Sequence, residues 1–206
     1  MLIAPLFLYI NIKHLYMVKK FLFVCLYTML ISSTSTLVGQ TDNDSFEDKI
    51  VWSETRPLTW DDFQGETQDI AHSVAETNAG FKASWHFINN YKKLEFKVYA
   101  YFIPSKSWYE QEHATNYVLN HEQRHFDIAE IFARKLRRQF TAIRSGDISA
   151  LSDKKLSAIY KEVFAEYDKV QQLYDEETES GVNEEAQEKW NKRIDAILKN
   201  LIAFAQ

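Results

Sequence analysis

Apolar residues recur every three to four positions between residues 118 and 143, with charged residues between them. This spacing is typical of a helix with one face toward a core, and its members are Val118, Ile128, Phe132, Leu136, Phe140 and Ile143. The charged face of the same helix carries Arg124, Arg134, Lys135, Arg137 and Arg138. Ser107 and Glu110 have the spacing of a capping box, and Gly146 supplies a stop. We therefore predict one long helix, or a short one leading into a longer one, between residues 107 and 144.

Two further helices are predicted after residue 150. Ser152 and Asp153 begin the first, and its apolar stripe comprises Leu156, Ile159, Tyr160, Val163, Tyr167, Val170, Leu173 and Tyr174. Ser180-Gly181 ends this helix. Asn183 can cap the last helix, since acidic residues follow it in the first turn as the helix dipole favours. The buried face of that helix comprises Trp190, Ile194, Ile197, Leu201 and Phe204.

Two segments before the helices alternate between apolar and polar residues with a period of two. The first contains Phe81, Ala83, Trp85 and Phe87, and the second contains Leu94, Phe96, Val98, Ala100 and Phe102. Asn89-Asn90 separates them, which predicts an antiparallel hairpin with one buried face and with His86 exposed. Pro104 ends the second strand. The chain is thus predicted to be α+β, with a small antiparallel sheet followed by three helices.

The segment before the hairpin mixes large aromatic residues with turn residues. Residues 41–48 are polar and acidic and are expected to be a tail. Residues 50–65 predict a short strand, a turn and an aromatic plug on the core. Residues 66–78 are polar and predict a loop along the functional site, with His72 as a candidate metal ligand.

The N-terminal region has the layout of a secretory signal peptide. Residues 1–40 contain no Asp or Glu, and Lys19-Lys20 is followed by an apolar run from Phe21 to Ile31 and then by small polar residues. The alternative start at Met17 gives a standard signal and makes residues 1–16 an over-extended gene start. We predict a signal peptide over residues 1–40 and a single domain over residues 41–206, which places the protein in the secreted, periplasmic or cell-envelope compartment. Retention as an uncleaved membrane anchor is the alternative, because residues 2–12 are also apolar.

Cysteine content and charge narrow the range of functions. Cys25, the only cysteine, lies in the apolar run, so the predicted mature chain has no disulfide, thiolate metal site or cysteine nucleophile. After residue 40 there are 21 Lys and Arg against 29 Asp and Glu, a formal charge of −8. A nucleic-acid partner is not expected, since phosphate binding needs a basic surface.

The helix from residue 118 contains a candidate metal motif, His121-Glu122-Gln123-Arg124-His125. Two histidines four positions apart project from one helix face, where their imidazoles can share a zinc ion. Glu122 can then act as base toward a metal-bound water. The alternative is two core histidines satisfied by hydrogen bonds.

A catalytic zinc has three protein ligands, and the third is not evident from this motif. Asp127 and Glu130 project about 120° and 180° away from His121 around the helix, too far to reach the same ion. Asp127 could instead orient an imidazole as a hydrogen-bond acceptor. The metzincin extension is absent, so the third ligand is expected from the next helix, where the candidates are Glu162, Glu166, Asp175, Glu176 and Glu179.

Four pieces of the chain resemble a bacterial family of unknown function whose members are described as predicted secreted zinc-dependent proteases. The pieces are Leu58 to Gly65, His121 to Ile128, Tyr174 to Thr178, and Gln187 to Trp190 with Ile194. The resemblance implies a zincin-like α+β fold, a zinc cofactor and protease activity. The family pattern suggests a histidine shortly after Thr178, but Ser180 stands there, and Asp175 is then the residue that could complete the ligand set.

These observations predict a secreted or periplasmic zinc-dependent hydrolase, a metallopeptidase acting on a peptide or protein. His121, His125 and Asp175 would bind Zn²⁺, and Glu122 would be the general base. The alternative is a catalytically inactive zincin-like envelope binding protein, which Ser180 favours. Helix packing without zinc is the third interpretation.

Overall fold

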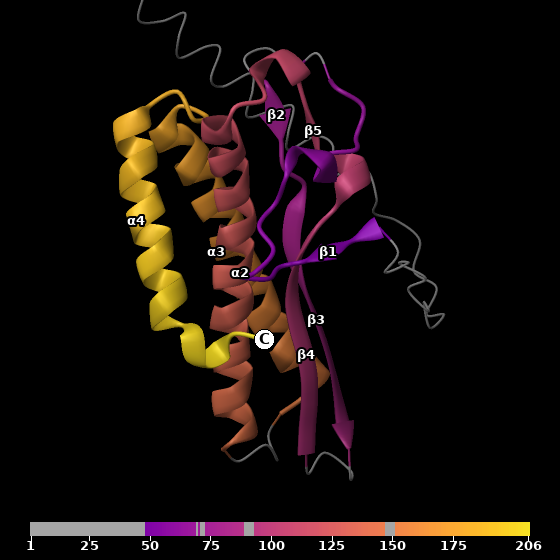
Figure 1. The fold of residues 1–206 in the computed structure, drawn as a ribbon. Coiled ribbons are helices and arrows are strands. Elements are labelled where there is room, and N and C mark those ends of the chain that lie inside the picture. Colours follow the sequence, from indigo (N-terminus) through magenta and orange to yellow (C-terminus); the bar gives the residue numbers. More distant parts are fainter. Residues whose placement is uncertain (1–47, 69, 71–72, 89–92, 147–150) are drawn as a thin grey trace, which may run out of the picture. The chain divides into compact units, whose positions relative to one another are not determined.

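A computed structural model describes residues 48–68, 70, 73–88, 93–146 and 151–206 of the chain. The predicted signal peptide, Cys25, His72 and the Asn89-Asn90 turn lie outside the described residues. The described part is α+β, with a small antiparallel sheet followed by three helices, as predicted (Figure 1). Within it, no helix is both long enough and apolar enough to cross a membrane.

The larger sheet has three strands in the order β1-β4-β3, with bounds Ile50–Val51, Lys93–Phe102 and Ala79–Ile88. The predicted antiparallel hairpin is present as β3 and β4, with Ala79 opposite Phe102 and Ile88 opposite Lys93. The inward face is the predicted one and includes Phe81, Leu94, Val98, Ala100 and Phe102. His86 is exposed as predicted.

A second sheet pairs β2 (Ala75–Glu76) with β5 (Trp108–Tyr109). The predicted helix start at Ser107 is therefore wrong. Ser107 Oγ donates to the Ile103 carbonyl and accepts from the Asn78 amide, and the following residues continue as a strand. Short 3₁₀ turns flank that strand at Pro104–Lys106 and Gln111–His113. The long helix begins later, with Thr115 as its cap.

The three helices are α2 (Asn116–Arg144), α3 (Asp153–Thr178) and α4 (Glu184–Asn200), and a 3₁₀ turn follows at Ile202–Phe204. Ser152 and Asn183 cap α3 and α4 through their side chains, as predicted, because each accepts a hydrogen bond from an amide in the first turn. Figure 1 shows α2 between the strands and α4. Its apolar stripe, including Phe132, packs on the hairpin.

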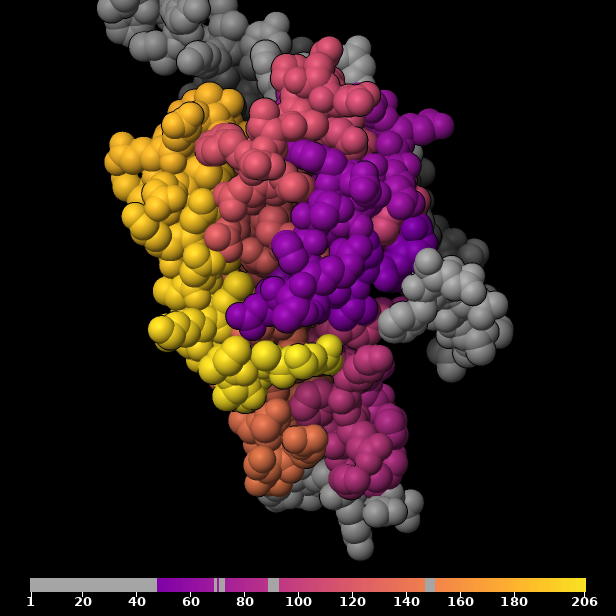
Figure 2. All heavy atoms as spheres, viewed as in Figure 1, coloured from indigo at the N-terminus to yellow at the C-terminus, as the bar shows by residue number. Residues whose placement is uncertain are grey.

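The charged face of α2 differs from the sequence pattern at two positions. Arg134 and Arg137 are buried, and both bind the carboxylate of Glu130. Each also donates to a backbone carbonyl of the C-terminal segment, at Leu198 and Phe204. The C-terminal segment crosses this face, and Figure 2 shows it in yellow beside the indigo N-terminal segment. Helical periodicity alone cannot predict this coverage, because it depends on tertiary packing.

The segment Leu58 to Gly65 has a structural role. Asp62 accepts from the Thr59 amide and hydroxyl, which closes a 3₁₀ turn at Trp60–Asp62. Leu58 and Phe63 enter the core, as the predicted aromatic plug requires. The Leu58 amide donates to Gln123 on α2. The turn therefore fixes the N-terminal segment against the helix that carries the His-Glu-x-x-His motif.

Candidate metal centre

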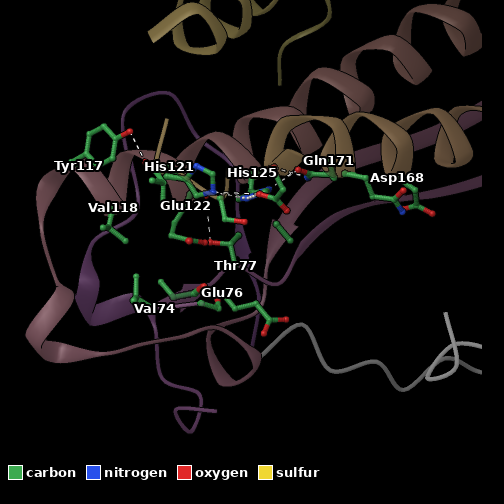
Figure 3. A pocket seen from close by; sticks show the side chains of 18 of the residues that line it. Val74, Glu76, Thr77, Tyr117, Val118, His121, Glu122, His125, Asp168 and Gln171 are labelled. Carbon is green, nitrogen blue, oxygen red and sulfur yellow. Dashed lines mark hydrogen bonds and ion pairs between the residues drawn. The ribbon is translucent and has the colours of Figure 1, made fainter. Parts of the chain in front are cut away.

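The fold brings the three predicted metal ligands together. His121 and His125 lie one turn apart on α2, and their Nε2 atoms are 3.3 Å apart. Asp175, from the last turns of α3, places Oδ1 at 3.3 Å from Nε2 of His121 and 3.0 Å from Nε2 of His125. Figure 3 shows the two histidines with Glu122 at the middle of a cavity.

These three distances fit a metal ion of the size of zinc. Zinc binds histidine nitrogen and carboxylate oxygen at about 2.0–2.2 Å, and two ligands of a tetrahedral ion are then roughly 3.3–3.5 Å apart. The observed separations of 3.0–3.3 Å are close to such edges. A set of two imidazoles and one carboxylate leaves a fourth position for a water or a substrate, which is the composition of a catalytic site.

Two glutamines orient the imidazoles. Nδ1 of His121 lies 2.9 Å from Oε1 of Gln187, and Nδ1 of His125 lies 2.7 Å from Oε1 of Gln171. The amide nitrogen of Gln171 donates to the His125 carbonyl, and that of Gln187 donates to Tyr174 and Asn191, so both amide orientations are fixed. Because the carboxamide oxygens accept, each Nδ1 carries the hydrogen and each Nε2 keeps its lone pair for a metal.

The predicted role of Asp127 as an acceptor for an imidazole is wrong. Its carboxylate accepts instead from Trp52, Gln123 and Arg124. Asp127 projects away from the histidines around α2, so these donors reach it and the imidazoles do not. Its role is to join the N-terminal segment to α2.

Packing holds the His121 ring on both sides. Tyr174 stacks on it with centroids 4.7 Å apart and an interplanar angle of 19°. The turn between α3 and α4 also contacts the ring. Gly181 in this turn has φ +86°, and a Cβ there would lie 3.2 Å from His121 Cγ. Only glycine adopts this backbone conformation without strain. The tight packing leaves the imidazole little freedom to rotate.

The charges of the cluster are strongly coupled. Burial alone would lower the pKa of His125, but the Asp175 carboxylate, aided by Glu122 and Gln171, raises it to about 9. Burial would raise the pKa of Asp175, but the two imidazoles hold it well below its usual range. The cluster therefore favours positive charge at Nε2 of His125, where a metal ion would compete with the proton.

Glu122 is buried beside the histidines, with 5% of its surface exposed. Its Oε2 atom has no hydrogen-bond partner among the described residues. A buried carboxylate oxygen without a partner is costly, and here it belongs to a side chain that lines the cavity. At this position, the Glu122 carboxylate could accept a proton from a molecule bound in the cavity.

The cavity has a volume of about 580 Å³ and is formed by α2, α3, the turn between α3 and α4, and residues 73–77. The predicted loop along the site is thus present, with β2 within it. Ser180 lines the cavity too, next to Gly181 and on a left-handed backbone, but the third residue of the candidate metal-binding group is Asp175. The roles of Gln171 and Gln187 were not predicted, and the only signal for Gln187 was that it lies in a piece of the chain that resembles the family.

The other candidate ligands do not join this cluster. Among the described residues, the group around His121 comprises only His125 and Asp175 besides itself, without Glu162, Glu166, Glu176 or Glu179. Glu166 pairs with Lys135 instead. A second group, made of Glu110, Glu112 and His113, lies largely exposed before α2.

Comparison with known proteins gives one match. The model of a family described as "Bacterial protein of unknown function (DUF922)" matches residues 105–182. The matched region contains His121, Glu122, His125 and Asp175, together with Gln171. No curated protein matches the chain. No solved structure matches it either.

Proposed function

We propose that this protein is a zinc-dependent hydrolase, specifically a metallopeptidase that acts in the secreted, periplasmic or cell-envelope compartment. The observation that carries the proposal is the set of three ligand atoms 3.0–3.3 Å apart, adjacent to a buried carboxylate oxygen without a partner. The Glu122 oxygen is costly as it stands, because a buried polar atom without a hydrogen bond is not compensated for its lost hydration. A cation between the three ligand atoms and a water beside Oε2 would occupy both positions.

The geometry supports the following roles. His121, His125 and Asp175 would hold the ion, which supplies a water of lowered pKa and polarises a substrate carbonyl. Glu122 would accept a proton at Oε2 from the water that attacks the carbonyl, and would later release it to the leaving amine. Gln171 and Gln187 would keep the imidazoles in the ligating tautomer.

The surroundings of the cavity support a peptide substrate. β2 lines the cavity and pairs with β5 in a two-stranded sheet, so its other edge has no strand partner in that sheet. An extended chain can add to such an edge through main-chain hydrogen bonds. A volume of about 580 Å³ is also in the range of sites that hold several residues or a drug-sized ligand.

The metal is tested by elemental mass spectrometry on the purified full chain. We expect about one zinc per chain in the wild type and a large loss in the His121→Ala and Asp175→Ala variants. His86→Ala is the matched control, because His86 is exposed and remote from the cavity lining. Absence of zinc in the wild type after incubation with the metal would exclude the hydrolase.

Catalysis is tested separately with Glu122→Gln in a peptide-library assay. This variant should retain zinc and lose turnover by a factor of at least about 10², as expected for loss of a general base. Zinc binding without turnover in the wild type would favour a non-catalytic envelope binding protein that keeps the metal.

A further inference from the structure

The cavity lining is unbalanced in charge. Four of its residues carry carboxylates, Glu76, Glu122, Asp168 and Asp175, and none is Lys or Arg. Asp175 and Glu122 have roles in the proposed chemistry, and Glu76 accepts a hydrogen bond from the Trp108 indole. Asp168 has no role in that chemistry. A charge imbalance alone does not define a binding site, so the position of Asp168 and its neighbours have to be considered as well.

Asp168 lies on the face of α3 that lines the cavity. It is seven residues before Asp175, so it lies roughly 10 Å away along the helix and within about 20° around it. Figure 3 shows it beyond Gln171 at one end of the cavity, with His125 and His121 between it and Tyr117. An extended chain lying over the candidate metal centre along α3 would therefore also pass Asp168.

An exposed aromatic ring accompanies this carboxylate. Phe164, one turn before Asp168 on α3, lines the same cavity and is 36% exposed. Its inner side packs on Phe81 and Tyr167. Residues at i and i+4 of a helix are neighbours, so an apolar surface adjoins an anion. Lys and Arg side chains match such a pair, because an apolar stem ends in a cation and can lie over an aromatic ring.

The described part of the chain does not itself supply this cation. No salt bridge of the described residues includes Asp168, although carboxylates at Glu166 and Glu185 on other surfaces do have lysine partners. Partial burial raises the pKa of Asp168 without an opposing charge. A cation from outside would offset that cost.

The opposite end of the cavity is apolar. Val74 and Val118 line it, and Val182, which is 76% exposed, also lines the cavity. Figure 3 shows Val118 and Tyr117 on the side of His121 away from Asp168. The two ends thus differ in the side chains that they accept, which would fix the direction of a bound chain.

We propose that Asp168, with Phe164, forms a specificity subsite for a Lys or Arg side chain of the substrate. The inference rests on the proposed function, since it names the substrate class of the same site: peptides with a cationic residue on one side of the cleaved bond. Strand residues advance by about 3.3 Å each, so a long cationic side chain one or two residues from that bond reaches Asp168.

The test compares peptides that differ at one position only, with arginine, citrulline or glutamate. Citrulline is the uncharged isostere of arginine, so the arginine-to-citrulline ratio of kcat/KM isolates the charge. For a partly exposed ion pair we expect a ratio of about five at low salt. The ratio should shrink as ionic strength rises, because salt screens exposed charges.

Variants test whether Asp168 causes the preference for a cationic side chain. Asp168→Asn should bring the arginine-to-citrulline ratio to about one, and Asp168→Lys should favour the glutamate peptide. Glu162→Gln, which neutralises an exposed carboxylate of α3 outside the cavity lining, should keep the wild-type ratio. Turnover with no charge preference, or a preference that Asp168→Asn retains, would overturn the subsite.

Binding to the Glu122→Gln variant, measured by fluorescence anisotropy with the same peptides, separates the two proposals. If no peptide is cleaved but arginine peptides bind more tightly in an Asp168-dependent way, the subsite stands and the hydrolase fails. If peptides are cleaved without preference, the hydrolase stands and the subsite fails. If neither turnover nor preferential binding occurs, both are overturned.

Discussion

Nδ1 of His121 on α2 lies 2.9 Å from Oε1 of Gln187, which is 66 residues later on α4. The last helix supplies no member of the candidate ligand set, yet it favours the tautomer whose Nε2 could bind a metal. Gln187 is buried and is itself held by Tyr174 and Asn191. The candidate metal centre therefore depends on the docking of α4 as well as on the motif in α2.

Gln187→Leu should lower zinc affinity by about 10- to 100-fold, the usual cost of losing a hydrogen-bond partner of a metal-binding histidine. Leucine keeps most of the volume but cannot accept from Nδ1. Competition with a chromogenic chelator measures the affinity, and circular dichroism checks the fold. Gln139→Leu changes an exposed glutamine of α2 and should leave the affinity unchanged. Equal affinities in all three proteins would show that the Gln187 contact does not tune the site.

Gly181→Ala should both destabilise the protein and weaken zinc binding. The residue has φ +86°, and the added Cβ would lie 3.2 Å from Cγ and 3.3 Å from Nδ1 of His121. A left-handed non-glycine residue costs about 1–3 kcal/mol, so urea unfolding should show a loss of that size. Gly146→Ala is the control, because its Cβ would make ordinary contacts at 3.6 and 3.7 Å. A tolerated Gly181→Ala would mean that the turn after α3 shifts away from His121 without cost.

Glu130→Gln should lower the free energy of unfolding by about 3 kcal/mol or more, because it leaves two buried guanidinium groups without their carboxylate. Arg134 and Arg137 both bind Glu130, and the exposed fractions of all three side chains are below one tenth. Glu188→Gln removes an exposed partner of Lys192 and should cost less than about 1 kcal/mol. Urea denaturation compares them, and similar losses in both variants would contradict the structural role of the buried cluster.

The sequence predicted what depends on local spacing. The α2 stripe, the caps Ser152 and Asn183, and the hairpin alternation each reflect a helix or strand period, and the structure follows them. The pair His121 and His125 has the same basis, because residues four apart on a helix share a face. The signal peptide and the hydrolase activity stay predictions.

What the sequence did not predict depends on contacts between distant segments. The Ser107 capping box was overridden by the pairing of β5 with β2, since hydrogen bonds to Asn78 and Ile103 take the serine hydroxyl. The sequence pattern places Arg137 on a solvent-exposed helix face, but in the structure the C-terminal segment covers it. Gln171 and Gln187 are a residue type found mostly on surfaces, and nothing local marks them as partners of histidines.

Asp62 should make the free energy of unfolding depend on pH. Burial would raise its pKa, but hydrogen bonds from Arg56 and Thr59 outweigh this and lower it below the usual value near 3.8. A carboxyl whose pKa is depressed by folding contributes stability above its unfolded-state pKa and loses it as pH falls through the folded-state value. The turn that joins the N-terminal segment to α2 should therefore weaken in acid.

The measurement compares the wild type with Asp62→Asn by urea unfolding across the acid range. Asparagine still accepts from the Thr59 amide but carries no charge for Arg56, so we expect a loss of about 1–2 kcal/mol at neutral pH. This difference should stay constant above pH about 5 and shrink below about 3.8, because the carboxyl is protonated first in the unfolded chain and, at still lower pH, in the folded protein. Asp61→Asn, next to it and exposed, should change stability by less than about 0.5 kcal/mol. A difference as large at pH 3 as at pH 7 would mean that the side-chain shape of Asp62, and not its charge, holds the turn.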